Sequence, residues 1–142
     1  FRQTMFAEFE KMMHEMDAAG EPLTAQSLGD AYYELNKKYY GPAVDAHPYI
    51  AREWSRIPHF YYNFYVYKYA TGFCAAQIFK QRILEGEDKR DQYLDFLRAG
   101  GSDDPLALVK KGGVDLTDRK VLEDAFAGFK SAVSELRELL LG

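Results

Sequence analysis

The amino-acid sequence predicts an all-α protein. Apolar residues recur at spacings of three and four along most of the 142 residues, no segment alternates apolar and polar residues with a period of two, and glycine or proline ends the periodic stretches. Helices joined by short connections usually pack as antiparallel neighbours, so we expect an antiparallel multi-helix array. A chain of this length can bury a core, which predicts a single domain over residues 1–142.

Two helices are expected in the first third of the chain. The first stops at Gly20, which is followed by Pro22. Its methionines fit core packing better than an adaptable binding groove. The second begins after Thr24, a side chain suited to an N-cap, and ends at Gly41. The apolar residues at helical spacing are Met5, Phe6, Phe9, Met12, Met13 and Met16 in the first helix and Leu28, Tyr32, Leu35 and Tyr39 in the second.

An aromatic segment follows residues 43–57, a mixed stretch that predicts a loop and a short helix. Pro58 suits the first turn of a helix, because the missing N–H has no intrahelical acceptor there. We therefore expect a helix from Pro58 to Glu85, ended by Gly86. Tyrosine, phenylalanine and valine also favour strands, but the apolar run continues to Leu84, too far for an ordinary strand.

This expected helix carries polar rings on one side. At about 100° per residue, His59, Tyr62, Val66 and Tyr69 fall within an arc of roughly 80°. A face with an imidazole and two phenols can donate hydrogen bonds to an anionic or carbonyl oxygen. Tyrosines at helical spacing are more often core residues with satisfied hydroxyls, and the pattern alone leaves both interpretations open.

Three further helices are expected in the second half. The first covers residues 88–99. Asp104 and Pro105 then combine an N-cap with a proline at the first helical position, which opens a short helix that ends at Gly112. The last helix opens near Thr117. The residues expected to face inward are Tyr93, Phe96 and Leu97 in the first of these helices and Val121, Leu122, Ala125, Phe126, Phe129, Val133, Leu136, Leu139 and Leu140 in the last.

Composition excludes several function classes. A formal charge of −4 argues against a nucleic-acid partner, which needs a basic surface. No apolar run approaches the roughly 20 residues of a membrane span, so no membrane partner is expected. The single cysteine, Cys74, excludes an intrachain disulfide and indicates a reducing compartment, the cytoplasm. Its small and apolar sequence neighbours favour a buried structural thiol over a nucleophile.

The residues of this chain do not predict a metal site of their own. His14 and Glu15 begin like the helical zinc-peptidase motif, but Ala18 stands where a second histidine is required to place two imidazoles on one face. The other two histidines have no ligand-type spacing. The chain begins with Phe1 in the middle of an amphipathic pattern, without the features of a signal peptide, so we expect a part of something longer.

Several segments together resemble the C-terminal part of oligoendopeptidase F, a bacterial group of the thimet oligopeptidase-like zinc peptidases. The resemblance covers nearly all of the chain. The most specific segment is IPHFYYNFYVY at 57–67. The others are RQTMFAEFE (2–10), GEPLT (20–24), YELNKKYYG (33–41), YATGF (69–73), FLRAGGS (96–102), PL (105–106) and GVDLT (113–117).

This resemblance implies a helical enzyme whose deep channel admits short peptides. It places the zinc ligands and the general base on helices upstream of Phe1, so the chain is expected to be a C-terminal piece of a larger catalytic domain that binds no zinc and is inactive alone. Helices shaped to pack on a missing part leave apolar surface exposed, and the isolated piece is therefore expected to dimerise.

The resemblance also implies which residues take part in the reaction. It places a histidine and two tyrosines on the wall opposite the metal, which match His59, Tyr62 and Tyr69; Tyr61 competes with Tyr62, and the helical arc favours Tyr62. Tyr69 is expected to stabilise the oxyanion of the tetrahedral intermediate, while His59 and Tyr62 orient the peptide. The alternative is a noncatalytic helical module that binds a peptide or partner helix on its aromatic face.

Overall fold

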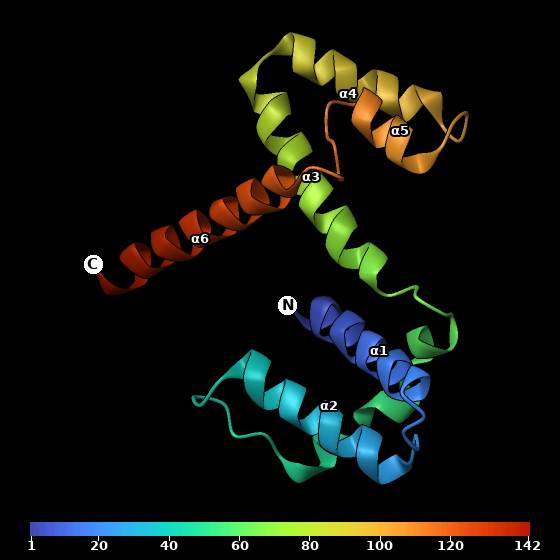
Figure 1. Ribbon diagram of the computed structural model, residues 1–142. Coiled ribbons are helices and arrows are strands. Elements are labelled where there is room, and N and C mark those ends of the chain that lie inside the picture. The colour runs from blue at the N-terminus through green and yellow to red at the C-terminus, as the bar shows by residue number, and fades with distance from the viewer. The chain divides into compact units, whose positions relative to one another are not determined.

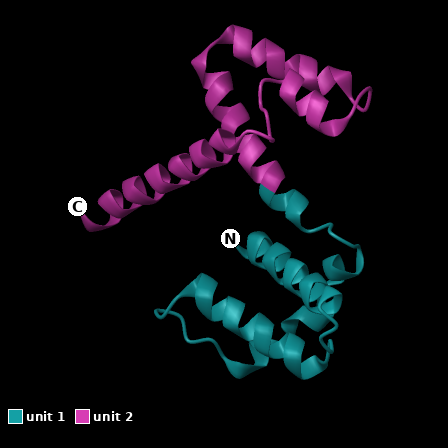
Figure 2. Ribbon diagram, viewed as in Figure 1, with its two compact units in different colours: residues 1–70 teal, residues 71–142 magenta.

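The computed structural model describes residues 1–142 and confirms the all-α class. The chain folds into two compact units, residues 1–70 and 71–142 (Figure 2). Each unit contains a hydrophobic core. The elements in chain order (Figure 1) are α1 (Arg2–Ala18), α2 (Ala25–Tyr40), η1 (Pro48–Arg56), η2 (Pro58–Tyr61), α3 (Tyr67–Glu85), α4 (Glu87–Ala99), α5 (Pro105–Lys111) and α6 (Arg119–Leu141), where η marks a 3₁₀ helix.

The first two helices begin and end where the sequence predicts. They run antiparallel (Figure 1), and the segments that follow them contain Gly20 and Gly41, both with positive φ. The hydroxyl oxygen of Thr24 accepts the N–H of Ser27 at 3.0 Å, and the hydroxyl oxygen of Ser27 accepts the N–H of Thr24 at 2.9 Å. This capping box satisfies backbone donors that the helix itself leaves without partners.

Aromatic rings dominate the core of the unit formed by residues 1–70. The fully buried Phe9 packs edge-to-face on Tyr32, with ring centroids 5.0 Å apart, and on Phe60, at 5.2 Å. Gly29 lets α2 approach η1 closely, because a Cβ at this position would lie only 3.2 Å from the carbonyl oxygen of Ala51. The buried residues of this core are Met5, Phe6, Phe9, Leu28, Tyr32, Leu35, Ile57 and Val66.

The expected helix from Pro58 to Glu85 is wrong in its first part. The 3₁₀ helix η2 ends at Tyr61, and the backbone then adopts φ values of 47° at Asn63 and 57° at Phe64. Two successive residues with positive φ do not fit in a right-handed α-helix. The α-helix begins only at Tyr67, and its end at Glu85 is as predicted.

The cause of this break is tertiary packing. Ile57 and Val66 are both buried in the core, and Phe60 packs against it, so the intervening chain must leave the core and return to it. Residues 61–65 form the exposed turn that this requires. The prediction that these residues share one helical face is therefore also wrong. Val66 lies inside the core, whereas His59, Tyr62 and Tyr69 do not.

The unit formed by residues 71–142 has a smaller core. Cys74 is buried as predicted, and burial raises the pKa of its thiol. Asp104 caps α5, where its Oδ1 accepts the N–H of Leu106 at 2.9 Å. The N-cap of α6 is Asp118, one residue beyond the predicted Thr117. The buried residues of this core are Cys74, Ala75, Ile78, Phe79, Val114 and Ala125.

Several apolar residues of this unit do not face inward as predicted. Leu97 is exposed, although its neighbours Tyr93 and Phe96 pack against the core. In α6 the first apolar residues, Val121, Leu122 and Ala125, belong to the core. The later ones are exposed: Phe126, Phe129, Val133, Leu136, Leu139 and Leu140. None of the helices is long and apolar enough to cross a bilayer.

Candidate functional site

His59 and Tyr69 come together although they do not share a helix. Nε2 of His59, in η2, lies 3.3 Å from the hydroxyl oxygen of Tyr69, in the first turn of α3. The two rings meet edge-to-face with centroids 5.5 Å apart. The turn at residues 61–65 lies between them in the chain. The predicted pair is therefore adjacent, but by a different backbone route from the one expected.

Tyr65 links the rings of this group. It stacks on His59, with centroids 5.8 Å apart and an interplanar angle of 20°. It also meets Tyr69 and Tyr62 edge-to-face, each at 5.8 Å. We call His59, Tyr62, Tyr65 and Tyr69 the ring cluster. The sequence pattern does not indicate Tyr65, because a continuous helix places it outside the arc shared by the other three residues.

Tyr62 and Tyr61, the two candidates for the first site tyrosine, point to different places. Tyr62 joins the ring cluster through its contact with Tyr65. The hydroxyl of Tyr61 donates instead to the carbonyl oxygen of Ser55 in η1, at 3.2 Å. The geometry thus favours Tyr62, through a contact with Tyr65 rather than through the helical arc.

Tyr69 is a neutral hydrogen-bond donor at neutral pH, as an ordinary phenol is. A side-chain hydrogen bond with Tyr65 raises the pKa of Tyr69 further. Tyr62, Tyr65 and Tyr69 all reach solvent, with exposed fractions of 63%, 37% and 45%. Nδ1 of His59 is buried and has no hydrogen-bond partner. The cluster thus presents phenol hydroxyls at the surface over a partly buried imidazole.

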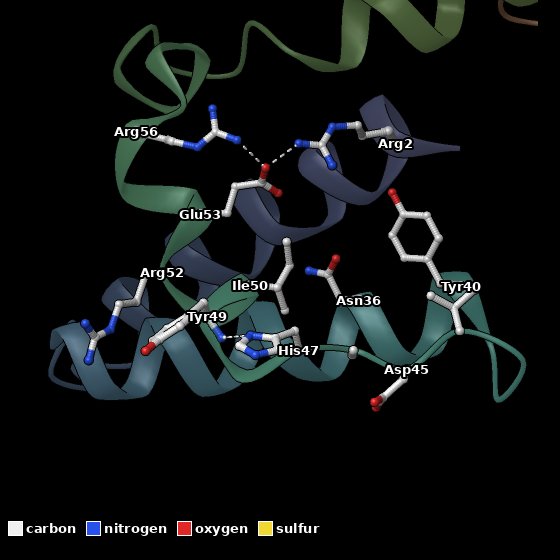
Figure 3. A pocket seen from close by; sticks show the side chains of 12 residues that line it. Arg2, Asn36, Tyr40, Asp45, His47, Tyr49, Ile50, Arg52, Glu53 and Arg56 are labelled. Carbon is white, nitrogen blue, oxygen red and sulfur yellow. Dashed lines mark hydrogen bonds and ion pairs between the residues drawn. The ribbon is translucent and has the colours of Figure 1, made fainter.

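A cavity of about 640 Å³ lies elsewhere in the same unit, between the end of α2, the segment after it and η1 (Figure 3). None of the ring-cluster residues lines it. Its charged centre is Glu53, whose Oε1 accepts hydrogen bonds from Arg2 and Arg56, both at 2.7 Å (Figure 3). Oε2 of the same carboxylate accepts the hydroxyl of Tyr32 at 2.7 Å.

The hydrogen bonds of Glu53 stabilise the fold. Burial opposes ionisation of this carboxylate, but hydrogen bonds from Arg2 and Tyr32 outweigh that effect and hold the pKa of Glu53 below its usual value. Both carboxylate oxygens are already occupied by these donors. The carboxylate therefore links α1, α2 and η1.

No group of three His, Cys, Asp or Glu side chains in the chain could hold a metal ion. His14, the residue that begins like a zinc-peptidase motif, instead stacks on Phe64, with ring centroids 4.1 Å apart. These residues therefore do not match the zinc site that the resemblance implies.

Comparison with known proteins places the chain among peptidases. Residues 1–128 match the model of peptidase family M3. Oligopeptidase PepF of Bacillus subtilis (strain 168) is 51% identical over 142 residues, which cover 99% of this chain and 21% of that protein. The plasmid-encoded oligoendopeptidase F of Lactococcus lactis subsp. cremoris is 50% identical over 99% of this chain and 24% of its own length.

A solved structure agrees with these relatives. The crystal structure of oligoendopeptidase-F from Enterococcus faecium superposes with a TM-score of 0.92 at 52% identity, covering 99% of this chain and 27% of that one. The chain therefore spans about a quarter or less of the length of the proteins that it matches. The match extends through η2, the turn at 61–65 and α3, the elements that carry the ring cluster. From this sequence and fold similarity, the chain belongs to peptidase family M3.

Proposed function

We propose that this chain is the C-terminal part of a zinc oligopeptidase catalytic domain, in which the ring cluster contacts short peptide substrates. The observation that carries the proposal is the approach of His59 Nε2 to the Tyr69 hydroxyl at a solvent-accessible surface. Similarity to oligopeptidases along 99% of the chain supports it and favours it over a noncatalytic peptide-binding module. The zinc and the general base belong to residues outside this chain, and the chain alone has no peptidase activity.

Tyr69 stabilises negative charge on the reacting peptide oxygen. Peptide hydrolysis converts a neutral carbonyl into a tetrahedral intermediate with an anionic oxygen, and a neutral phenol that donates to this oxygen lowers the barrier. The phenol of Tyr69 carries its proton at neutral pH and can therefore donate it to a hydrogen bond. Because the charge develops only during the reaction, this hydrogen bond acts on kcat more than on substrate binding.

His59 and Tyr62 orient the substrate. If Nε2 of His59 carries a proton and donates a hydrogen bond to the Tyr69 oxygen, the O–H of Tyr69 can turn from Tyr65 toward the bound peptide. Tyr62, the most exposed phenol of the ring cluster, is placed to bind the peptide backbone beside it. These two roles act on the geometry of the bound peptide and so affect KM as well as kcat.

Steady-state kinetics of the full-length enzyme test this proposal. Tyr69→Phe keeps the ring and removes only the hydroxyl, and we expect kcat to fall about 10²-fold with little change in KM. Tyr61→Phe is the matched control, because its hydroxyl donates to Ser55 and not to the ring cluster. An unchanged kcat in Tyr69→Phe would remove this residue from the mechanism.

The exposed half of α6 is the surface that packs on the rest of the full-length polypeptide. Val133, Leu136 and Leu140 are exposed at helical spacing, which forms an apolar stripe. Monomeric proteins rarely leave such stripes in water. The solved relative is nearly four times longer than this chain, so ample polypeptide exists to cover the stripe. In the isolated chain, pairing with a second copy is the remaining way to bury it.

A further inference from the structure

The turn that carries Tyr65 has a strained backbone. Asn63 and Phe64 have φ values of 47° and 57°, in the left-handed region. Asparagine tolerates this region, but for a bulky residue such as phenylalanine it is a genuine outlier. Left-handed backbone at a non-glycine residue is strained and persists only where neighbouring groups stabilise it. Another part of the chain must therefore stabilise this turn.

Glu10 of α1 stabilises this turn. Its side chain is buried, and its Oε1 accepts the backbone N–H of Phe64 at 2.6 Å, across 54 positions of sequence. A buried carboxylate needs such partners, and a bond between a charged acceptor and a backbone donor is stronger than a neutral one. Asp104 and Asp118 also accept backbone N–H groups, but from residues two or three positions away in the sequence, whereas Glu10 accepts one from a distant segment.

The same helix holds the side chain of Phe64 as well. His14 lies four residues after Glu10 and therefore on the same side of α1. Its ring stacks on that of Phe64 at 4.1 Å with an interplanar angle of 24°. Phe64 is 47% exposed, so burial of its ring does not explain its place. Helix α1 thus fixes both the backbone and the ring of the strained residue.

The position of Phe64 determines that of the ring cluster. Tyr65 follows it directly and contacts His59, Tyr62 and Tyr69. We propose that Glu10 is a positioning residue of the peptidase site: its buried carboxylate holds the strained turn at Asn63 and Phe64, and the turn places Tyr65 against His59 and Tyr69. This inference rests on the proposed function of the ring cluster. Glu10 itself touches no substrate.

The full-length enzyme provides the test. Glu10→Leu removes the acceptor at similar size, and we expect kcat to fall about 10-fold through misplacement of the rings, measured well below the melting temperature. Glu10→Gln retains an acceptor oxygen and should recover most of the lost kcat. Glu15→Gln is the control on the same helix, because Glu15 is exposed and pairs only with Lys11. Amide hydrogen exchange at Phe64 should accelerate in Glu10→Leu and not in Glu15→Gln.

A second pair of variants tests the turn without touching the core. Asn63 is exposed, so substitution there should not prevent folding. Asn63→Val places a β-branched residue at positive φ and should lower kcat as Glu10→Leu does. Asn63→Gly accepts this φ and should retain kcat. This pair decides the proposal even if Glu10→Leu does not fold.

The results distinguish the positioning role of Glu10 from the proposed function of the ring cluster. A reduced kcat in Tyr69→Phe together with an unchanged kcat in Asn63→Val and in folded Glu10→Leu would overturn the positioning role alone. An unchanged kcat in Tyr69→Phe would overturn the proposed function and this inference with it. Loss of stability without loss of kcat per folded molecule in Glu10→Leu would show a merely structural carboxylate and would also overturn the inference.

Discussion

The core around α1 and the second half of α6 have the same apolar spacing in the sequence and opposite fates in the structure. Met5 and Phe9 of α1 are fully buried, whereas Leu136 and Leu140 of α6 are largely exposed. The difference lies in the partners: α2, η1 and η2 cover α1, and no comparable element covers the end of α6. Amphipathic periodicity therefore predicts a helix and its apolar face, but not whether this chain supplies the partner for that face.

Substitutions in the core around α1 should lower the free energy of unfolding most. Phe9→Ala removes a buried ring that packs on Tyr32 and Phe60, and we expect it to lower the free energy of unfolding by about 3–5 kcal/mol. Fluorescence of Trp54, the single tryptophan, reports this transition, because its ring lies 6.3 Å from that of Phe9. Phe126→Ala, at an exposed position, should change it by only about 0.5 kcal/mol. Equal costs would contradict the comparison.

The next effect concerns association of the isolated chain. We expect it to dimerise through the stripe on α6, and the double variant Leu136→Glu with Leu140→Glu to weaken the dimer about 10²-fold or more, because two charges replace two buried apolar side chains. Sedimentation equilibrium measures this directly. Glu138→Gln, on the opposite side of the helix, should leave the dimer intact. A chain that remains monomeric at high concentration would refute the proposed apolar contact.

A smaller effect is expected from pH. The folded-state pKa of Glu53 lies below its unfolded value, so its contribution to stability is present above the unfolded pKa and is lost as the pH falls through the folded pKa. Glu53→Gln should cost about 1.5 kcal/mol at pH 7 and flatten the decline in stability below about pH 4.5. Urea titrations followed by Trp54 fluorescence at several pH values measure both quantities.

The smallest effect is expected for an exposed ion pair. Lys110 lies 2.7 Å from Asp115, and hydrogen bonds from Lys110 and Thr117 lower the pKa of Asp115 to about 2. Lys110 is exposed and Asp115 is only partly buried, so water screens their attraction. Asp115→Asn should therefore shift the Trp54-monitored transition less than Glu53→Gln does at every pH. A shift as large as that of Glu53→Gln would show that the two sites differ less than their burial indicates.

Features set by nearby residues could be predicted from the sequence. Thr24 caps α2 and Asp104 caps α5, because the side chain and the amides it satisfies are neighbours in the chain. Gly41 follows α2 for an equally local reason. In each case the relevant atoms lie within a few residues, so the pattern alone was sufficient.

The turn at residues 61–65 could not be predicted in this way. Glu10, which stabilises the turn, lies 54 positions from Phe64 in the sequence. The path of the backbone depends on the burial of Ile57 and Val66 in the core. Asn63, which tolerates positive φ, is the one local signal that could have indicated it. His59 and Tyr69 do meet, but as neighbours across this turn and not along a helix. Their roles stay a prediction.

We propose that the Tyr69 hydroxyl binds the transition state more strongly than it binds the substrate. In the full-length enzyme, the most direct measurement is the affinity of Tyr69→Phe for a peptide analogue whose scissile amide is replaced by a tetrahedral phosphinate. We expect this analogue to bind about 10²-fold more weakly than to the unsubstituted enzyme, while the KM of the parent peptide hardly changes. Equal affinity of both enzymes for the phosphinate would show that the Tyr69 hydroxyl does not stabilise the transition state.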